Sequence, residues 1–188
     1  MRPRVVVGIS GASGAAIGVS VVEHLAEIGA EVDLVISRAA RRTLDTEVGA
    51  EGLARMQGRA TRNHDVADIG ATIASGSVPT SGMIVAPCSM RSLSAIANSL
   101  SDNLLVRAAD VHLKERRPLV LVAREAPLHL GHLRAMTSVT EMGAIVMPPV
   151  PAFYLRPMTV GEIVDQIARR CIDLMRFGEP MARPWNGK

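Results

Sequence analysis

The chain has 188 residues, 48% of them hydrophobic, which is enough apolar material for one well-buried domain but not comfortably for two. The formal net charge is only +3 and the basic residues are interleaved with acidic ones, so we expect a small phosphorylated ligand and no nucleic acid. No apolar run approaches the roughly 18 residues that a membrane helix needs, and we therefore expect a cytoplasmic protein without a membrane span.

Short β-branched runs alternate with longer amphipathic segments, which is typical of βαβ units and a parallel sheet. Strands are predicted over residues 4–9, 31–36, 83–86, 118–122 and 144–147. Helices are predicted over residues 15–28, 38–46, 90–98, 102–116, 130–142 and 159–176. Residues 48–82 show no period and are predicted to form a long loop. The whole chain, 1–188, is expected to be a single doubly wound α/β domain, flavodoxin-like or Rossmann-like, with a parallel sheet flanked by helices.

The first predicted strand breaks into a glycine-rich turn, Ser10-Gly11-Ala12-Ser13-Gly14, before the first helix. Glycines let the backbone approach a ligand, while serine hydroxyls and the N–H groups of a helix start bind anions. The spacing fits neither the dinucleotide fingerprint nor the P-loop, and no lysine follows Gly14. The turn predicts a phosphate or cofactor site, and an ordinary strand-to-helix turn is the alternative.

Polar residues also follow the other predicted strands, at the edge where open parallel sheets bind ligands. They are Ser37 after the second strand, Ser89 to Ser92 after the third, and Arg124 with Glu125 after the fourth. Ser37 and Ser89 can alternatively be helix N-caps, a role that suits serine. Their position beside the glycine turn favours a ligand site on this edge.

Lysine is rare in this chain, because of the 21 basic residues only Lys114 and the terminal Lys188 are lysines. A sequence that otherwise uses arginine can need a compact charge for a phosphate or a mobile proton. The alternative for Lys114 is an ordinary solvated helix end.

All four aromatic residues lie in the last 36 positions, so the core is predicted to be aliphatic. Tyr154 belongs to a proline-rich segment, residues 148–157, which should form a rigid loop that presents the hydroxyl to a phosphate. Trp185 near the end of the chain predicts that the tail, about residues 177–188, docks over the site or on a neighbouring subunit.

Five stretches match, in the same order, motifs of one known family: residues 8–14, 87–90, 114–121, 124–128 and 149–154. On these motifs the chain resembles the UbiX flavin prenyltransferases, from about Arg4 to Trp185. The resemblance implies that the protein binds reduced FMN and joins the five-carbon group of dimethylallyl phosphate to flavin N5 and C6. It also implies a metal-independent reaction, a UbiD-type decarboxylase as recipient of the prenylated FMN, and a homo-oligomer, a dodecamer in this family, with sites shared between subunits.

Carried onto this sequence, the resemblance assigns three sets of site residues. FMN would contact Gly11, Ala12, Ser13, Ser37, Ser89, Met90, Arg91, Ser92 and Arg124. Dimethylallyl phosphate would contact Lys114, Arg124, Glu125, Tyr154 and Arg170. Chemical roles would fall to Ser13, Glu47, Glu125 and Trp185, with Glu47 as the proton-transfer group beside Ser13. Ile69 departs from the pattern, because some members have an aromatic residue there that could stack on the flavin.

Other functions remain as alternatives. A flavin-dependent cysteine decarboxylase should carry a catalytic histidine and an asparagine-bearing turn in place of residues 87–90, and His64 has no supporting motif. A non-catalytic FMN carrier would have no use for a second phosphate pocket. Direct decarboxylation of aromatic acids by this chain alone would lack an electron sink unless the flavin were already modified.

The cysteines and the remaining histidines are not predicted to form a metal site. Cys88 and Cys171 lie far apart in the sequence and are expected to be free thiols. The other histidines, which have no carboxylate or cysteine partner at a ligand spacing, are His24, His112, His129 and His132.

Overall fold

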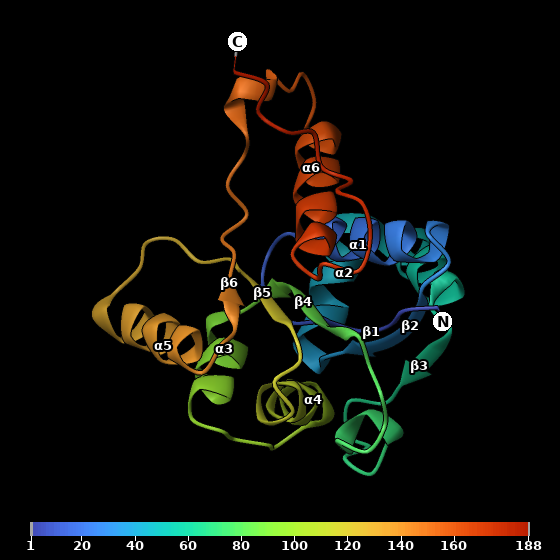
Figure 1. Ribbon diagram of the computed structural model, residues 1–188, viewed down its shortest axis with the longest axis vertical. Helices are drawn as coiled ribbons and strands as arrows, with labels where there is room; N and C mark the ends of the chain where they lie inside the picture. Colours follow the sequence, from blue (N-terminus) through green and yellow to red (C-terminus); the bar gives the residue numbers. More distant parts are fainter. Residues whose placement is uncertain (1, 188) are drawn as a thin grey trace.

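The computed structural model describes residues 2–187 and has a six-stranded sheet at its centre (Figure 1). The strands are β1 Arg4–Ile9, β2 Glu31–Ile36, β3 Arg62–His64, β4 Gly82–Cys88, β5 Leu119–Ala123 and β6 Ile145–Val146. The helices are α1 Ala15–Glu27, α2 Arg38–Arg59, α3 Met90–Ala97, α4 Leu104–Lys114, α5 Leu130–Glu141 and α6 Val160–Asp173, with short 3-10 turns η1 Thr72–Ala74 and η2 Phe153–Leu155. Neighbouring strands are parallel in the order β3-β2-β1-β4-β5-β6, which confirms the doubly wound α/β fold.

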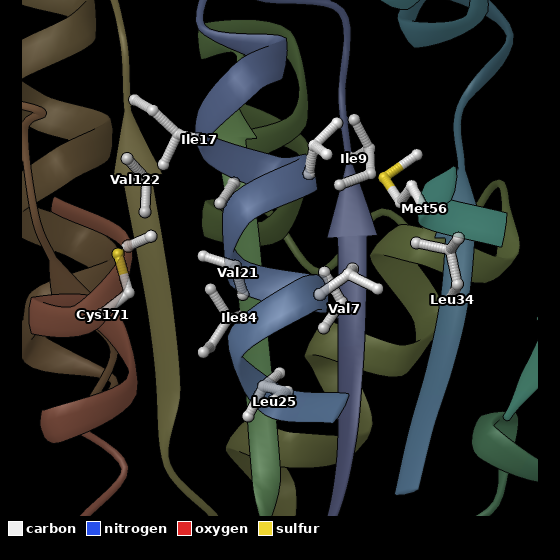
Figure 2. Packing of buried hydrophobic residues seen from close by; sticks show 14 of the residues in the cluster. Val7, Ile9, Ile17, Val21, Leu25, Leu34, Met56, Ile84, Val122 and Cys171 are labelled. Atoms are coloured by element: carbon white, nitrogen blue, oxygen red, sulfur yellow. The ribbon is translucent and has the colours of Figure 1, made fainter. Parts of the chain in front are cut away.

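Each face of the sheet carries its own layer of helices. On one face α1 lies between α2 and α6. Figure 2 shows this packing, with Val7 and Ile9 of β1 beside Val21 and Leu25 of α1. The apolar side chains of α3, α4 and α5 pack on the other face. Because the central strands are buried on both faces, they consist almost entirely of Val, Ile, Leu and other apolar residues.

Gly18 explains how closely α1 approaches the sheet. A Cβ atom at this position would lie 2.3 Å from the carbonyl oxygen of Ala86 in β4. Any other residue would push the helix away from the strand. The close approach keeps the first turn of α1 beside the carboxyl end of β4.

The prediction of one long loop over residues 48–82 was wrong for about half of that segment. Helix α2 continues to Arg59, with one interruption at Gly49, whose φ of 66° lies outside the helical region. The short strand β3 follows, and η1 comes before a loop that leads into β4. Residues 62–64 are Arg, Asn and His, so this edge strand has no apolar alternation by which the sequence could have revealed it.

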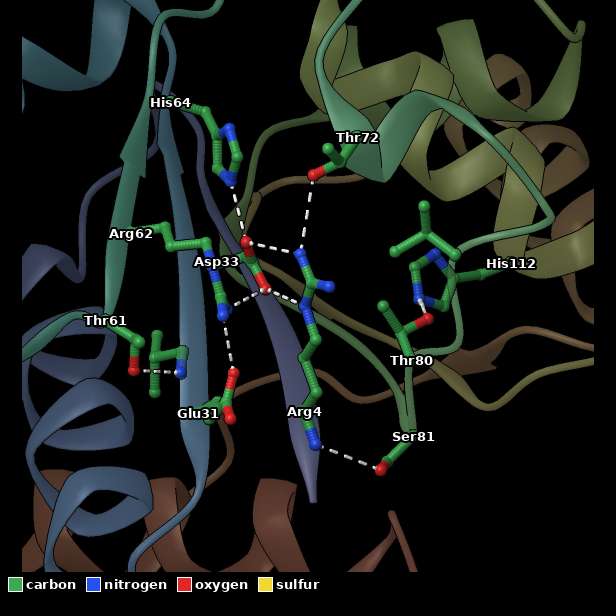
Figure 3. Close-up of polar contacts among 12 residues, drawn as sticks. Arg4, Glu31, Asp33, Thr61, Arg62, His64, Thr72, Thr80, Ser81 and His112 are labelled. Atoms are coloured by element: carbon green, nitrogen blue, oxygen red, sulfur yellow. Dashed lines mark hydrogen bonds and ion pairs between the residues drawn. The ribbon is translucent and has the colours of Figure 1, made fainter. Parts of the chain in front are cut away.

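Charged side chains, rather than apolar ones, fasten β3 to the sheet (Figure 3). Asp33 of β2 is fully buried and binds Arg4 (Nε to Oδ2, 2.7 Å) and His64 (Nε2 to Oδ1, 2.7 Å). Arg62 of β3 lies 3.6 Å from the same carboxylate. Burial opposes ionisation of Asp33, but the hydrogen bonds from Arg4 and His64 outweigh it, and its pKa lies below the ordinary value. The segment after β3 is thereby held against the body of the protein.

The C-terminal part extends away from the sheet (Figure 1). After the two-residue strand β6, the chain runs through the proline-rich segment and η2 to the start of α6. The tail after α6 turns back along this helix to the same end. None of the helices among residues 2–187 has the length and apolar character needed to cross a membrane.

Candidate functional site

A cleft of about 640 Å³ lies at the carboxyl ends of the first four strands. The strand order reverses direction between β1 and β4, and the turns after both strands line the cleft, as expected for an open α/β sheet. Five predicted FMN-binding residues contribute to its lining: Gly11, Ser37, Ser89, Arg91 and Ser92. The other four, Ala12, Ser13, Met90 and Arg124, lie on turns or helix starts at the same edge but outside this lining.

Three helices begin at the cleft, each with a capping side chain. Ser37 Oγ accepts a hydrogen bond from Ala40 N (3.1 Å) at the start of α2, and Ser89 Oγ accepts one from Ser92 N (3.3 Å) at the start of α3. Asn103 caps α4 in the same way. The two serines are therefore both N-caps and cleft residues, so the capping and ligand interpretations are compatible.

Ser10, which was not among the predicted site residues, joins the two central turns. Its side chain is buried, its hydroxyl donates to the carbonyl oxygen of Pro87 (3.0 Å), and its Oγ accepts from Ser89 N–H (2.6 Å). The turn after β1 and the turn after β4 are thus held in a fixed relation by one side chain.

The opposite wall of the cleft is apolar and comes from Val66, Ala67, Ile69 and Leu105. Hydroxyls and helix N-termini suit a phosphate, whereas an apolar wall suits a flat ring, so this lining fits FMN. Ile69 lines the cleft, so a flavin ring bound there would have an aliphatic neighbour in place of an aromatic one.

Glu47 of α2 reaches the first turn of α1. Its Oε2 accepts hydrogen bonds from Gly14 N–H (2.9 Å) and Ala15 N–H (2.8 Å), and the Ser13 hydroxyl also binds the carboxylate. Burial opposes ionisation, but these hydrogen bonds and the charge of Arg124 outweigh it, so the pKa of Glu47 lies below its ordinary value. The structure therefore gathers Ser13, Glu47 and Arg124, with an ionised carboxylate that can accept a proton.

A second cavity, of about 470 Å³, lies beyond β6 and against α6. Two residues that the resemblance assigned to the donor, Tyr154 and Arg170, line it, together with Trp185, to which the resemblance gave a chemical role. The rings of Tyr154 and Trp185 meet edge to face, with centroids 5.2 Å apart and planes at 84°. Met147 and Val150 add apolar surface. An arginine beside apolar and aromatic side chains suits a phosphate that carries a short apolar group.

Lys114 is not brought to this cavity within one chain. It ends α4, ahead of β5, and so lies at the amino edge of the sheet, where its ammonium pairs with Glu115. Arg124 directly follows β5 and lies at the opposite, carboxyl edge, with Glu125 next to it. A helix that leads into a parallel strand ends at the amino edge, so the order of elements already carried this information.

Comparison with known proteins decides the family. The chain matches the family model described as Flavoprotein over residues 1–171. It is 52% identical to the flavin prenyltransferase UbiX of Thauera aromatica over 184 residues, which cover 98% of this chain and 94% of that protein. The chain belongs to the UbiX flavin prenyltransferase family.

Solved structures of UbiX-type proteins have the same fold over nearly the whole chain. AnUbiX, crystallised in complex with FMN and dimethylallyl pyrophosphate, matches with a TM-score of 0.95 at 42% identity, over 100% of both chains. A dodecameric FMN-dependent Ubix-like decarboxylase from Escherichia coli O157:H7 matches with a TM-score of 0.93 at 43% identity, over 98% of this chain and 100% of that chain. The FMN-dependent cysteine decarboxylase TvaF, at 15% identity and a TM-score of 0.62, shares the fold alone. The resemblance predicted from the motifs is confirmed.

Several residues in or beside the cleft of this UbiX-family chain were not predicted. Ser10 stands inside the glycine-rich motif, but its role depends on a second turn 77 residues away. Val66 and Ala67 follow an edge strand that the sequence did not reveal. Asp102 lines the cleft and pairs with Arg91. The charges alone do not predict this contact, because it also depends on where the helices α3 and α4 begin.

Among residues 2–187, no three His, Cys, Asp or Glu side chains are grouped closely enough to hold a metal ion. Cys88 and Cys171 are free and buried, and burial raises the pKa of each thiol to about 12. Neither thiol is therefore a nucleophile near neutral pH.

Proposed function

We propose that this UbiX-family enzyme joins the dimethylallyl group of dimethylallyl phosphate to N5 and C6 of reduced FMN. The observation that carries the proposal is a pair of distinct sites, one lined by hydroxyls and helix N-termini and the other by an arginine and two aromatic rings. A protein that only stores flavin needs the first site alone.

Reduced FMN supplies the electron-rich N5 and C6 atoms that form the new bonds to carbon. The chain binds and orients it: the starts of α2 and α3, with Ser37 and Ser89, would hold the phosphate. Val66 and Ile69 would cover an apolar part of the ring and exclude water there.

The second cavity would hold the donor. The bond between the allylic carbon and the phosphate oxygen breaks, and phosphate leaves with the electron pair. Arg170 can bind the leaving phosphate through two N–H donors, and the Tyr154 hydroxyl can donate a further hydrogen bond. Met147 and Val150 would surround the five-carbon group, which Trp185 covers.

Glu47 would accept the proton that is lost when the new ring closes at C6. Its carboxylate is ionised and bound to the Ser13 hydroxyl, which can relay the proton or orient the ring. Its lowered pKa makes it a weak base, so the proton would pass on to solvent.

We infer that Lys114 completes the donor site of a neighbouring subunit. It is half exposed at the amino edge, away from Arg170, and the Escherichia coli relative is dodecameric. A UbiX-type assembly of this chain would place the amino edge of one subunit beside the second cavity of another.

The prenylated FMN that the reaction forms would serve a UbiD-type decarboxylase.

The reaction is tested by incubating the purified protein anaerobically with reduced FMN and dimethylallyl phosphate. We expect the released flavin to be heavier by one five-carbon unit in its mass spectrum and to have an altered absorption spectrum. Unmodified FMN with both the monophosphate and the diphosphate donor would contradict the proposal and favour a flavin carrier.

Sharing of the donor site is tested with Lys114→Ala and Arg170→Ala, each expected to be inactive alone. When the two variants are co-expressed in equal amounts and assemble at random, a site has about a one-half chance of an intact Lys114 and about a one-half chance of an intact Arg170. About one quarter of the sites should therefore receive both intact residues, from two different chains. We expect about a quarter of the wild-type rate. If both residues act from the same chain, no site in the mixture is intact and the mixture stays inactive.

A further inference from the structure

The tail after α6 has no regular secondary structure, yet two side chains of α6 fasten its backbone. The side chain of Asp173 is only 5% exposed, and its carboxylate oxygens accept hydrogen bonds from Met181 N–H (Oδ1, 2.6 Å) and Ala182 N–H (Oδ2, 3.2 Å). Two turns earlier, the Gln166 amide donates to the carbonyl oxygen of Arg183 (3.0 Å) and accepts from its N–H (3.1 Å). Four hydrogen bonds therefore hold three consecutive tail residues.

These contacts adjoin the second cavity. Pro180, Ala182 and Pro184 form one of its walls, and Trp185, two residues after the segment held by Gln166, makes the edge-to-face contact with Tyr154. Asp173 Oδ2 also lies 4.0 Å from Nη1 of Arg170, one helical turn away. The carboxylate that fastens the tail is thus the same one that faces the arginine of the cavity.

We propose that Asp173 and Gln166 are positioning residues of the donor site, which hold the tail so that Trp185 closes the cavity over the prenyl donor. The identity of the ligand rests on the proposed function, whereas the hydrogen bonds that hold the tail do not depend on it. Asp173 also orients Arg170 toward the cavity, so that closure by the tail and placement of the phosphate-binding charge depend on one side chain.

The tail depends on Asp173 and Gln166 because of its own composition. Residues 177–187 contain Gly and Pro and pack few apolar side chains, so their order depends on hydrogen bonds to α6. A carboxylate accepting two backbone N–H groups, and an amide pairing with both backbone groups of one residue, fix the direction of the chain as well as its position.

Trp185 is the only tryptophan in the sequence, so its fluorescence reports on the tail alone. The full-length protein is compared with Asp173→Ala, Asp173→Asn and Gln166→Ala by emission wavelength, anisotropy and acrylamide quenching. We expect red-shifted emission, lower anisotropy and about a twofold rise in the quenching constant for Asp173→Ala, with smaller changes for Gln166→Ala. Asp173→Asn keeps one acceptor and should fall between the wild type and Asp173→Ala.

The matched control is Asp165→Asn, which removes a carboxylate from the same helix. Asp165 binds His24 and Arg169, which lie outside the tail, so the fluorescence of this variant should equal that of the wild type. Far-ultraviolet circular dichroism checks that each variant is folded, and Gln166→Ala keeps the test valid if Asp173→Ala fails to fold.

Kinetics separate positioning from simple anchoring of the terminus. Loss of the tail contacts should raise KM for dimethylallyl phosphate about tenfold while Kd for FMN stays within about twofold of the wild type. Asp173→Asn should recover part of this loss.

Unchanged Trp185 fluorescence in both Asp173→Ala and Gln166→Ala would overturn the fastening, whatever the activity. Altered fluorescence with unchanged donor KM would overturn the positioning role. If the wild type itself makes no prenylated flavin, the proposed function fails, and fluorescence still decides whether the two residues hold the tail.

Discussion

Ser10 is 1% exposed, and its hydroxyl lies between the turns that follow β1 and β4. Both turns line the cleft of about 640 Å³ that we propose as the flavin site, through Gly11 on one side and Ser89 on the other. If the hydroxyl is removed, the partly buried Ser89 N–H loses its acceptor, which costs on the order of 1 kcal/mol. Part of that cost should appear as a looser arrangement of the two turns.

We therefore expect Ser10→Ala to weaken FMN binding about tenfold, measured by fluorescence titration of the flavin with the purified protein. Ser20→Ala, the same substitution within α1, is the control and should bind FMN as the wild type does. Equal affinity of Ser10→Ala and the control would show that the hydroxyl does not set the geometry of the cleft.

The site residues that the sequence predicted are those whose position depends on local order in the chain. Ser37 and Ser89 directly follow strands, and the carboxyl ends of parallel strands meet at one edge, so topology alone places them. The bond from Ser10 to Ser89 depends on the approach of two distant turns. The capping of α1 by Glu47 likewise depends on the angle between two helices, which no local pattern encodes.

At the scale of elements, α4 is tied to the loop before β4 by a buried histidine. His112 Nδ1 donates to the carbonyl oxygen of Ala108 (2.6 Å), which can only accept, so Nε2 is left to accept from the Thr80 hydroxyl (2.9 Å). Burial, with the nearby charge of Arg117 in addition, lowers the pKa of His112 to about 4. The folded protein thus holds this imidazole neutral.

The sign of the pH effect follows from that shift. The unfolded chain takes up a proton on His112 near its ordinary pKa of 6.5, whereas the folded protein does so only near 4. The stabilising contribution is complete above pH 6.5 and is lost as the pH falls from 6.5 to 4, by on the order of 3 kcal/mol.

We expect urea unfolding between pH 7 and 4.5 to show a steeper loss of stability for the wild type than for His112→Gln, at one fixed protein concentration. His129→Gln, which replaces an exposed histidine, should keep the wild-type slope. If the stability of His112→Gln falls in parallel with that of the wild type, another group is responsible.

The elements that the sequence predicted well are those with strong periodicity. The bounds of β1 and β2 agree residue for residue, and five of the six helices agree to within three residues at each end. The second half of α2 was missed because Gly49 interrupts the period, and β3 was missed because a buried Asp33 takes the place of an apolar contact.

At the scale of the whole molecule, the segment after β6 carries apolar side chains that the rest of residues 2–187 leaves exposed. Phe153 is 73% exposed and Met158 is 86% exposed, on a segment that extends away from the sheet (Figure 1). Such surface is typical of subunit contacts, and a UbiX-type relative is dodecameric. Assembly of this chain would bury it.

We expect Phe153→Asp to shift the protein to smaller species in sedimentation velocity, with an unchanged far-ultraviolet circular dichroism spectrum. A charge at this position would have to be desolvated in the contact, which is unfavourable without a partner. An unchanged sedimentation coefficient would place the subunit contact elsewhere.

The two proposed sites draw on separate stretches of the chain. All residues lining the flavin cleft lie between Gly11 and Leu105, and all residues lining the second cavity lie between Met147 and Trp185. A ribosome adds about 5–20 residues per second, so about 4–16 s separate the synthesis of Leu105 from that of Trp185. The parts that receive the flavin are therefore made first, and a growing chain can meet FMN before the residues that receive the prenyl donor have been translated.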